Sequence, residues 1–199
     1  GVTTLGSNWL SSVNGYIACP EGLAGSIPAS AVSFKYKVEG NDVVLTGVFN
    51  LGETVTVPDF ITVIGEYAFD SFNSRHCENI TLPDTITEIR NHAFYDCSSL
   101  KSMNIPKNVT DIGSYAFENC TALSNVNFED GSKLSSISES VFKGCKVLTR
   151  IDIPQNVTNI GDAAFEGCIA LSEVKFEDGS KLNSIGSFAF YNCKALNSI

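Results

Sequence analysis

The chain has 199 residues, 43% of them hydrophobic, and a formal net charge of −9 from 13 basic and 22 acidic residues. A chain of this size is expected to form one domain that buries roughly 70% of its unfolded surface. Its Lys and Arg residues are scattered, which argues against nucleic acid as a partner and against docking on anionic lipid. No run of about 18 apolar residues occurs, so the sequence predicts no membrane insertion.

The N-terminal part of the chain differs from the rest. Residues 1–33 are dense in Gly, Ser, Ala and Pro, and we interpret them as a leader or an irregular N-terminal cap. Residues 34–38 alternate apolar and polar side chains, residues 39–42 contain a Gly-Asn pair, and residues 43–48 are again apolar. This pattern predicts a β-hairpin within 34–53. We expect the hairpin to cover the open apolar end of the repeats that follow.

From residue 54 to residue 199 the sequence repeats itself. An aromatic residue recurs at steps of 25 or 23 residues, at Phe69, Phe94, Phe117, Phe142, Phe165 and Phe190. A fixed step in the twenties is typical of a solenoid of stacked coils. Residues 103–151 closely match residues 151–199, so two successive repeats form a larger unit of 48 residues.

Each repeat contains three segments. The first is a predicted strand in which every second residue is apolar and points inward. These strands are 54–57, 79–82, 102–105, 125–128, 150–153 and 173–176, and a seventh begins at Asn197. A Pro or the longer sequence EDGSKL follows each strand, and then a short apolar segment such as Ile112-Gly113. The last segment, Ala-Phe-x-x-Cys, is expected to form a brief helical turn whose Phe fills the interior.

The repeated pattern I-P-x-x-V-T-x-I-G-x-x-A-F-x-x-C-x-x-L, as at 105–123 and 153–171, resembles the BspA-type leucine-rich repeat. The resemblance implies an α/β fold, a right-handed leucine-rich-repeat solenoid of short parallel strands with brief helical turns. It also implies secretion or display on the cell surface, and binding or adhesion without a cofactor. The first copy departs from the pattern, because Phe72 stands where Cys is expected and two extra residues follow it.

Five of the seven cysteines should form one column in the solenoid, because each lies three residues after the repeated Phe. They are Cys97, Cys120, Cys145, Cys168 and Cys193. Their expected spacing fits disulfides as well as a stack of small buried side chains, and we favour the stack. No CxxC pair of the kind found in zinc sites occurs. Cys19 and Cys77 lie off the column, and we expect them to be the more reactive thiols.

Two other patterns suggest chemistry, and we interpret both as structural. The adjacent His76 and Cys77 suggest a Cys–His nucleophile, but neighbouring side chains point apart and no third group orients the base. The EDG sequences at 129–131 and 177–179 suggest calcium, whereas calcium loops need more oxygen ligands at fixed spacing. We therefore predict solvated turns at EDG, a packing role for His92, and no enzymatic activity.

We call the sheet formed by these predicted strands the inner sheet. Its outward face is the candidate binding surface, since solenoids commonly bind extended partners there. Its candidate residues are Asn79, Thr81, Ser102, Asn104, Asn125, Asn127, Arg150, Asp152, Glu173 and Lys175. In register, Arg150 should pair with Glu173 and Asp152 with Lys175. The surface suits a polar protein or glycan of a host or neighbouring cell, and the sequence does not choose between them. The alternative is a solvated face on a structural spacer or scaffold without a ligand of its own.

The end of the chain leads to one further expectation. The last repeat stops within its strand at Ile199, without the polar terminal repeat that solenoids need for solubility. We therefore expect either that the native protein continues past this residue or that the last coil self-associates end to end with another copy.

Overall fold

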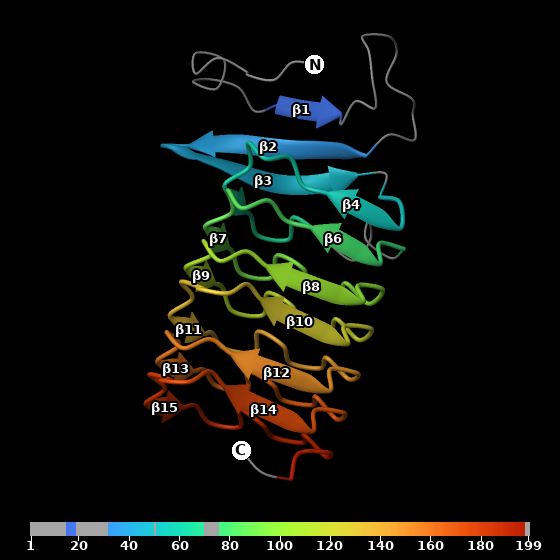
Figure 1. Cartoon of the computed structure of the whole chain (residues 1–199). Coiled ribbons are helices and arrows are strands. Elements are labelled where there is room, and N and C mark those ends of the chain that lie inside the picture. Colours follow the sequence, from blue (N-terminus) through green and yellow to red (C-terminus); the bar gives the residue numbers. More distant parts are fainter. Residues whose placement is uncertain (1–14, 19–31, 50, 70–75, 198–199) are drawn as a thin grey trace.

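The computed structural model describes residues 15–18, 32–49, 51–69 and 76–197. Most of these residues form a parallel β-solenoid of six stacked coils (Figure 1). Each coil contributes one strand to the inner sheet and one shorter strand to a second sheet, which we call the outer sheet. Within the described ranges, no helix is long and apolar enough to cross a membrane.

The inner sheet is built from the alternating segments that the sequence predicts as strands. They are β4 (Thr54–Thr56), β6 (Asn79–Thr81), β8 (Ser102–Ile105), β10 (Asn125–Phe128), β12 (Arg150–Ile153) and β14 (Glu173–Phe176). In β10 and β12 exposed and buried residues alternate, so the apolar side chains point inward and the polar ones outward. The paired strands run parallel, as β8 and β10 do with Ser102 beside Asn125.

The outer sheet consists of two-residue strands and the N-terminal hairpin. The short strands are β5 (Val63–Ile64), β7 (Glu88–Ile89), β9 (Asp111–Ile112), β11 (Ser136–Ile137), β13 (Asn159–Ile160) and β15 (Ser184–Ile185). Hydrogen bonding between them is interrupted once, between β9 and β11. Their isoleucines are buried in the first five coils, whereas Ile185 in the last coil is 46% exposed. The interior of the last described coil is therefore open on one side.

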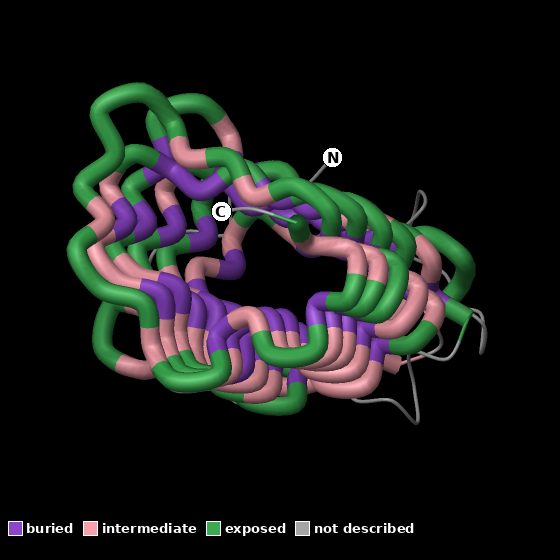
Figure 2. The backbone as a smooth tube through the Cα atoms, turned by 90° about the horizontal axis from the view of Figure 1, so that it is seen from below, coloured by how far each residue is buried: buried purple, intermediate pink, exposed green. Residues whose placement is uncertain are grey.

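A column of Phe side chains fills the interior of the solenoid, as the sequence predicts. Phe69, Phe94, Phe117, Phe142 and Phe165 are fully buried. Successive rings stack nearly parallel, with centroids 4.8 Å apart for Phe94 and Phe117 and 5.5 Å apart for Phe142 and Phe165. Figure 2 shows the result along the axis, where buried positions of successive coils lie behind one another.

The segment around each Phe is a run of tight turns, and the brief helical turns expected there are not confirmed in the described coils. Its backbone hydrogen bonds span three residues, as from Cys97 N to Phe94 O at 3.2 Å. In the third coil, Tyr115 and Asn119 have positive φ, 61° and 60°, and the second, fourth, fifth and sixth coils repeat this pattern. A right-handed helix needs negative φ throughout, so two left-handed residues within five positions prevent it.

The N-terminal hairpin is present, and its strands extend the outer sheet. β2 (Ser33–Glu39) pairs antiparallel with β3 (Asp42–Phe49), and Gly40 in the turn has a φ of 63°. On its other side β3 pairs in parallel with β5. The segment interpreted as a leader or irregular cap contributes β1 (Gly15–Ala18), which pairs antiparallel with β2. The hairpin's role as a cap stays a prediction.

Pairing in the inner sheet is interrupted between the fourth and fifth coils. β4, β6, β8 and β10 form one sheet and β12 and β14 another, so β10 and β12 are not hydrogen-bonded neighbours. The same two coils stay joined elsewhere, because β11 pairs with β13 and Phe142 N donates to Ala164 O at 2.8 Å. Only the inner strands separate at this junction.

Candidate functional site

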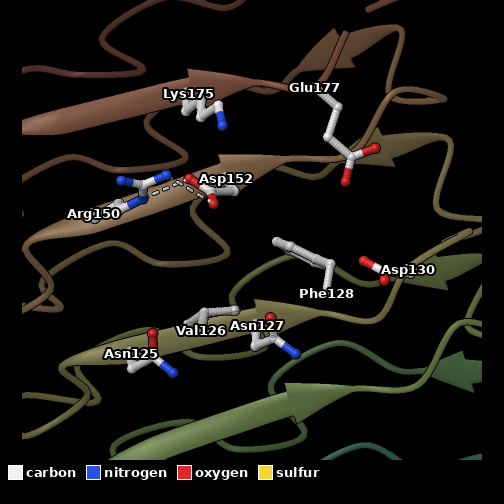
Figure 3. Close-up of a pocket in the computed structure, with 9 residues that line it drawn as sticks. All are labelled: Asn125, Val126, Asn127, Phe128, Asp130, Arg150, Asp152, Lys175 and Glu177. Atoms are coloured by element: carbon white, nitrogen blue, oxygen red, sulfur yellow. Dashed lines mark hydrogen bonds and ion pairs between the residues drawn. The ribbon is translucent and has the colours of Figure 1, made fainter.

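A hollow of about 300 Å³ opens on the inner sheet where β10 and β12 separate (Figure 3). Its lining residues are Asn125, Val126, Asn127, Phe128, Asp130, Arg150, Asp152, Lys175 and Glu177. Five of the candidate binding residues are among them: Asn125, Asn127, Arg150, Asp152 and Lys175. The structure leaves the other five on the same sheet but outside the hollow: Asn79, Thr81, Ser102, Asn104 and Glu173.

Arg150 is the centre of the charged part of this surface. Its Nε and Nη2 donate to the two carboxylate oxygens of Asp152 at 2.8 and 3.1 Å, and its Nη1 donates to Glu173 Oε2 at 2.9 Å. The hydrogen bonds with Asp152 raise the pKa of Arg150. A guanidinium can bind both oxygens of a carboxylate through two parallel hydrogen bonds, which an ammonium group cannot do. Arg150 therefore engages both carboxylate oxygens of Asp152.

The predicted register is confirmed, but one of the two predicted ion pairs differs. Arg150 lies beside Glu173 and Asp152 beside Lys175, as expected. Arg150 pairs with Glu173, yet Asp152 pairs with Arg150 of its own strand. Among the described residues, Lys175 forms no ion pair within 4 Å, and Figure 3 shows its ammonium group at the hollow, above Asp152.

The EDGSKL loop at 129–134 binds the fourth coil to the third, and we call this contact a clasp. Glu129 Oε2 accepts a hydrogen bond from Lys107 N at 3.1 Å, and Glu129 Oε1 accepts one from Asn104 Nδ2 at 2.8 Å. Lys133 Nζ donates to Asn108 Oδ1 at 2.8 Å. The predicted turn is confirmed, with Gly131 at a φ of 76°.

A second clasp joins the sixth coil to the fifth. Glu177 Oε2 accepts from Gln155 N at 2.9 Å, and Lys181 Nζ donates to Asn156 Oδ1 at 2.8 Å. The hollow thus lies between two clasped pairs of coils, at the one junction of the inner sheet in the described coils where strand pairing fails. Each pair corresponds to one 48-residue unit of the sequence.

Four lining residues were not among the sequence candidates. Asp130 and Glu177 belong to the EDG loops, which the sequence marks as turns without indicating that they border a hollow. Val126 and Phe128 are inward-facing residues, 5% and 8% exposed, and they reach the hollow because β10 and β12 part. The pairing of two strands is a non-local property, so no pattern within the strand sequences reveals it.

The cysteine column is confirmed as a stack of buried side chains, with an added role in joining coils. Each thiol donates to a Phe carbonyl of the preceding coil, as from Cys97 Sγ to Phe69 O at 3.0 Å and from Cys193 Sγ to Phe165 O at 3.1 Å. All six cysteines within the described ranges are thiols rather than disulfides. Burial raises the pKa of Cys145 well above its usual value and that of Cys168 to about 12.

The expectation that Cys77 is a reactive thiol is wrong. Cys77 is 1% exposed, its Sγ donates to Asn79 O at 3.5 Å, and burial raises its pKa to about 11. A nucleophilic cysteine needs a lowered pKa and an accessible sulfur. Cys19, the other thiol expected to be reactive, lies outside the described residues, as do the irregular position Phe72 and all but the first residue of the strand expected from Asn197.

His92 packs, as predicted, in a short aromatic ladder on the turn side of the solenoid. Its ring lies between those of Tyr67 and Tyr115, with centroids 4.8 and 4.9 Å away and planes within 17° and 12° of parallel. His92 is one of the positive-φ residues before the repeated Phe, which places its ring in line with the equivalent rings of neighbouring coils.

The fold and its repeated turns define a leucine-rich-repeat solenoid, and comparison with known sequences identifies the family. The family described as "BspA type Leucine rich repeat region" matches in six copies over residues 48–147 and 135–199. The chain therefore belongs to the BspA-type leucine-rich repeat family. Among curated proteins, no sequence matches it.

Several solved structures share the fold. A leucine-rich repeat protein from Eubacterium ventriosum is 26% identical, with a TM-score of 0.71 over 94% of this chain and 45% of that one. A leucine rich cell surface protein from Faecalibacterium prausnitzii is 24% identical, with a TM-score of 0.67 over 89% of this chain and 54% of that one. A leucine-rich repeat protein from T. pallidum is 26% identical, with a TM-score of 0.67 over 82% of this chain and 88% of that one. The chain spans about half the length of the first two proteins.

Proposed function

We propose that this chain is a non-enzymatic adhesion or binding module of a secreted or cell-surface protein. Its inner sheet binds a polar protein or glycan on a host or neighbouring cell. The observation that carries the proposal is the hollow between β10 and β12, on which five of the ten candidate side chains converge. Membership in a leucine-rich repeat family supports a binding or scaffold role.

The state of the cysteines is compatible with a location outside the cell. Thiols exposed to an oxidising environment form disulfides, and the reacting species is the thiolate. Buried thiols such as Cys77 and Cys168, with pKa values raised to about 11 and about 12, hold almost no thiolate at neutral pH. The repeat column can therefore persist as thiols in an extracellular protein.

The test is binding of the purified chain to an array of matrix proteins and glycans, with the thiols kept reduced. A variant of the hollow, Asn125→Ala with Lys175→Ala, is compared with a control on the same sheet, Asn79→Ala with Thr81→Ala. All four positions are exposed on the inner sheet, and only the first two line the hollow. Saturable binding that weakens in the first variant alone supports the proposal.

The second candidate is a spacer or scaffold without a ligand of its own. It is favoured by the pairing of Arg150 with Asp152 and Glu173, which neutralises the strongest charge on the surface. Exposed pairs of this kind contribute about 1 kcal/mol or less and occur on many solvated surfaces. Silence across the whole array supports the spacer, and binding that both variants retain contradicts a site on the hollow.

A further inference from the structure

The hollow differs from the rest of the inner sheet in having an apolar floor. In β8 and β12, the strands on either side of β10, the inward-facing residues are at most 1% exposed. Between β10 and β12, the inward-facing Val126 and Phe128 also line the space, and Figure 3 shows Phe128 directed from β10 into the gap. A ligand placed here contacts apolar groups below and polar groups around it. Sugar rings have this mixed character, because their C–H groups form apolar faces and their hydroxyls form a polar rim.

The polar walls of the hollow include several planar groups with two polar atoms each. Among the described residues, the Asn125 amide has no side-chain hydrogen bond, and Asn127 uses only its Nδ2, toward Asn104 Oδ1. Glu177 uses Oε2 toward Gln155 N and retains Oε1. A carboxamide can donate to one hydroxyl group and accept from the hydroxyl beside it, and a carboxylate can accept from two adjacent hydroxyl groups. Vicinal hydroxyls are the repeated feature of sugars.

The charge balance around the hollow favours a neutral ligand over an acidic one. Asp130, Asp152 and Glu177 carry three negative charges against the two positive charges of Arg150 and Lys175, which leaves one negative charge. Arg150 already donates to Asp152 and to Glu173. A carboxylate or sulfate on the ligand meets only one unengaged cation, and the chain as a whole has a net charge of −9.

The dimensions of the hollow fit a small ligand better than a protein surface. Its volume of about 300 Å³ lies at the lower end of the range for small-molecule sites. Protein interfaces bury about 800 Å² per partner and are anchored by aromatic residues at their centre. No exposed aromatic side chain lies on the inner-sheet strands β4 to β14.

We propose that the hollow between β10 and β12 binds a neutral, hydroxyl-rich sugar, one or two rings in size, and discriminates against acidic sugars. This inference rests on the proposed function and names the ligand class of the same site. Asn125 and Asn127 bind hydroxyls, Glu177 accepts from them, and Phe128 with Val126 lies against the C–H face of a ring.

The test uses matched neutral and acidic probes. Lactose, cellobiose, maltose and N,N′-diacetylchitobiose are compared with 3′-sialyllactose and a hyaluronan tetrasaccharide, by saturation-transfer NMR and calorimetry at up to 50 mM sugar. We expect at least one neutral probe to bind more tightly than either acidic probe. The Asn125→Ala variant should lower its affinity about 2- to 10-fold, the effect of one hydrogen bond. Thr56→Ala, at an exposed position of β4 outside the hollow, should leave it unchanged.

The repeat supplies a matched control for the charge argument. Asp130 lines the hollow, and Asp178 holds the equivalent place in the second EDG loop outside it. Asp130→Lys should raise the affinity for 3′-sialyllactose about fivefold relative to lactose, and Asp178→Lys should not.

The outcomes separate this inference from the proposed function. Tighter binding of the acidic probes in the hollow overturns the inference and leaves the binding module standing. The inference is also overturned, and the binding module left standing, if no sugar binds but fibronectin, tested in parallel, binds the wild type and not the Asn125→Ala variant. If none of the four neutral sugars binds at 50 mM, the inference is overturned. The proposed function fails with it only if the array of proteins and glycans is silent as well.

Discussion

In the second to sixth coils two residues adopt a left-handed backbone conformation, one on either side of the repeated Phe. Those that follow the Phe are Asp96, Asn119, Gly144, Gly167 and Asn192. Asp, Asn and Gly are the residue types that tolerate this conformation best. Those that precede the Phe are Tyr67, His92, Tyr115, Ser140, Ala163 and Phe188, which show no such preference. The left-handed position after the Phe could therefore be predicted from the residue types, whereas the position before it could not.

Glycine at the left-handed positions should be costly to replace. Gly167 has a φ of 73° and no heavy atom closer than 3.9 Å to an added Cβ, so Gly167→Ala tests the backbone alone. We expect it to lower the free energy of unfolding by about 1 kcal/mol. Gly144→Ala has the same φ cost and also places Cβ 2.5 Å from Asn119 Oδ1, so its effect should be larger. Urea unfolding of both variants measures this, and equal losses would contradict the role of Asn119.

The buried thiols should make the protein less stable at alkaline pH. The unfolded chain loses cysteine protons near the ordinary pKa of 9.0, whereas the folded protein keeps those of Cys77 and Cys168 until about 11 and about 12. The free energy of unfolding is thus unaffected below pH 9 and falls as pH rises from there toward 12. Each thiol contributes a slope of at most about 1.4 kcal/mol per pH unit.

Urea unfolding between pH 7.5 and 10.5, in the presence of a reducing agent, measures this dependence. Other groups titrate in the same range, so the informative quantity is the difference between the wild type and Cys168→Ala. The variant should be less stable at neutral pH and should lose less stability on going to pH 10.5. An identical decline in both proteins would show that Cys168 does not contribute.

At the scale of elements, the strands could be predicted and their pairing could not. Alternation of apolar and polar residues is a local pattern, and it places β10 and β12 correctly, with the expected faces inward. β8 and β14 have the same pattern, yet β8 pairs with a neighbour on both sides and β14 on one side only. Nothing in four residues indicates whether a strand bonds to the next coil. The hollow was therefore predictable as a surface but not as a recess with Val126 and Phe128 at its floor.

The clasps should protect individual backbone amides. Glu129 accepts from Lys107 N, and Glu177 accepts from Gln155 N in the equivalent place one unit later. Glu129→Ala should accelerate hydrogen exchange at the Lys107 amide about 2- to 10-fold, since one hydrogen bond is lost. The Gln155 amide in the same sample is the internal control.

The reciprocal variant, Glu177→Ala, should accelerate exchange at Gln155 and leave Lys107 unchanged. Hydrogen exchange followed by NMR resolves both amides. Acceleration of both amides by either variant would mean that the loop sequences stabilise the solenoid globally rather than through their own clasp.

At the scale of the whole described solenoid, the first and last coils differ. β3 of the hairpin pairs with β5 of the first coil, and Arg90 of the second coil forms an ion pair with Glu39 of the hairpin at 2.8 Å. In the last coil Ile185, Phe188 and Tyr191 are 46%, 68% and 60% exposed. Exposed apolar side chains grouped on one coil favour association.

We expect this chain to associate through its last coil. Sedimentation velocity should show a concentration-dependent increase in mass, and Ile185→Lys with Phe188→Ser should abolish it. Val147, 43% exposed on an earlier coil, provides the control, and Val147→Lys should leave the association intact. A monomer at all concentrations, or association that survives the double variant, would contradict end-to-end contact.

The clasps also constrain how such a protein can change in length by recombination. Each clasp needs an EDGSKL loop in one coil and an Asn-bearing Pro loop in the coil before it, as with Lys133 and Asn108. Gain or loss of 48 residues keeps every loop opposite its partner. The two loop types alternate in the last four coils. There, loss of the fifth coil alone sets the two EDGSKL loops side by side and leaves Glu177 without the Gln155 amide from which it accepts. In this part of the solenoid, crossing-over in steps of two coils should therefore be tolerated best, and lengths should vary among natural variants in multiples of the pair.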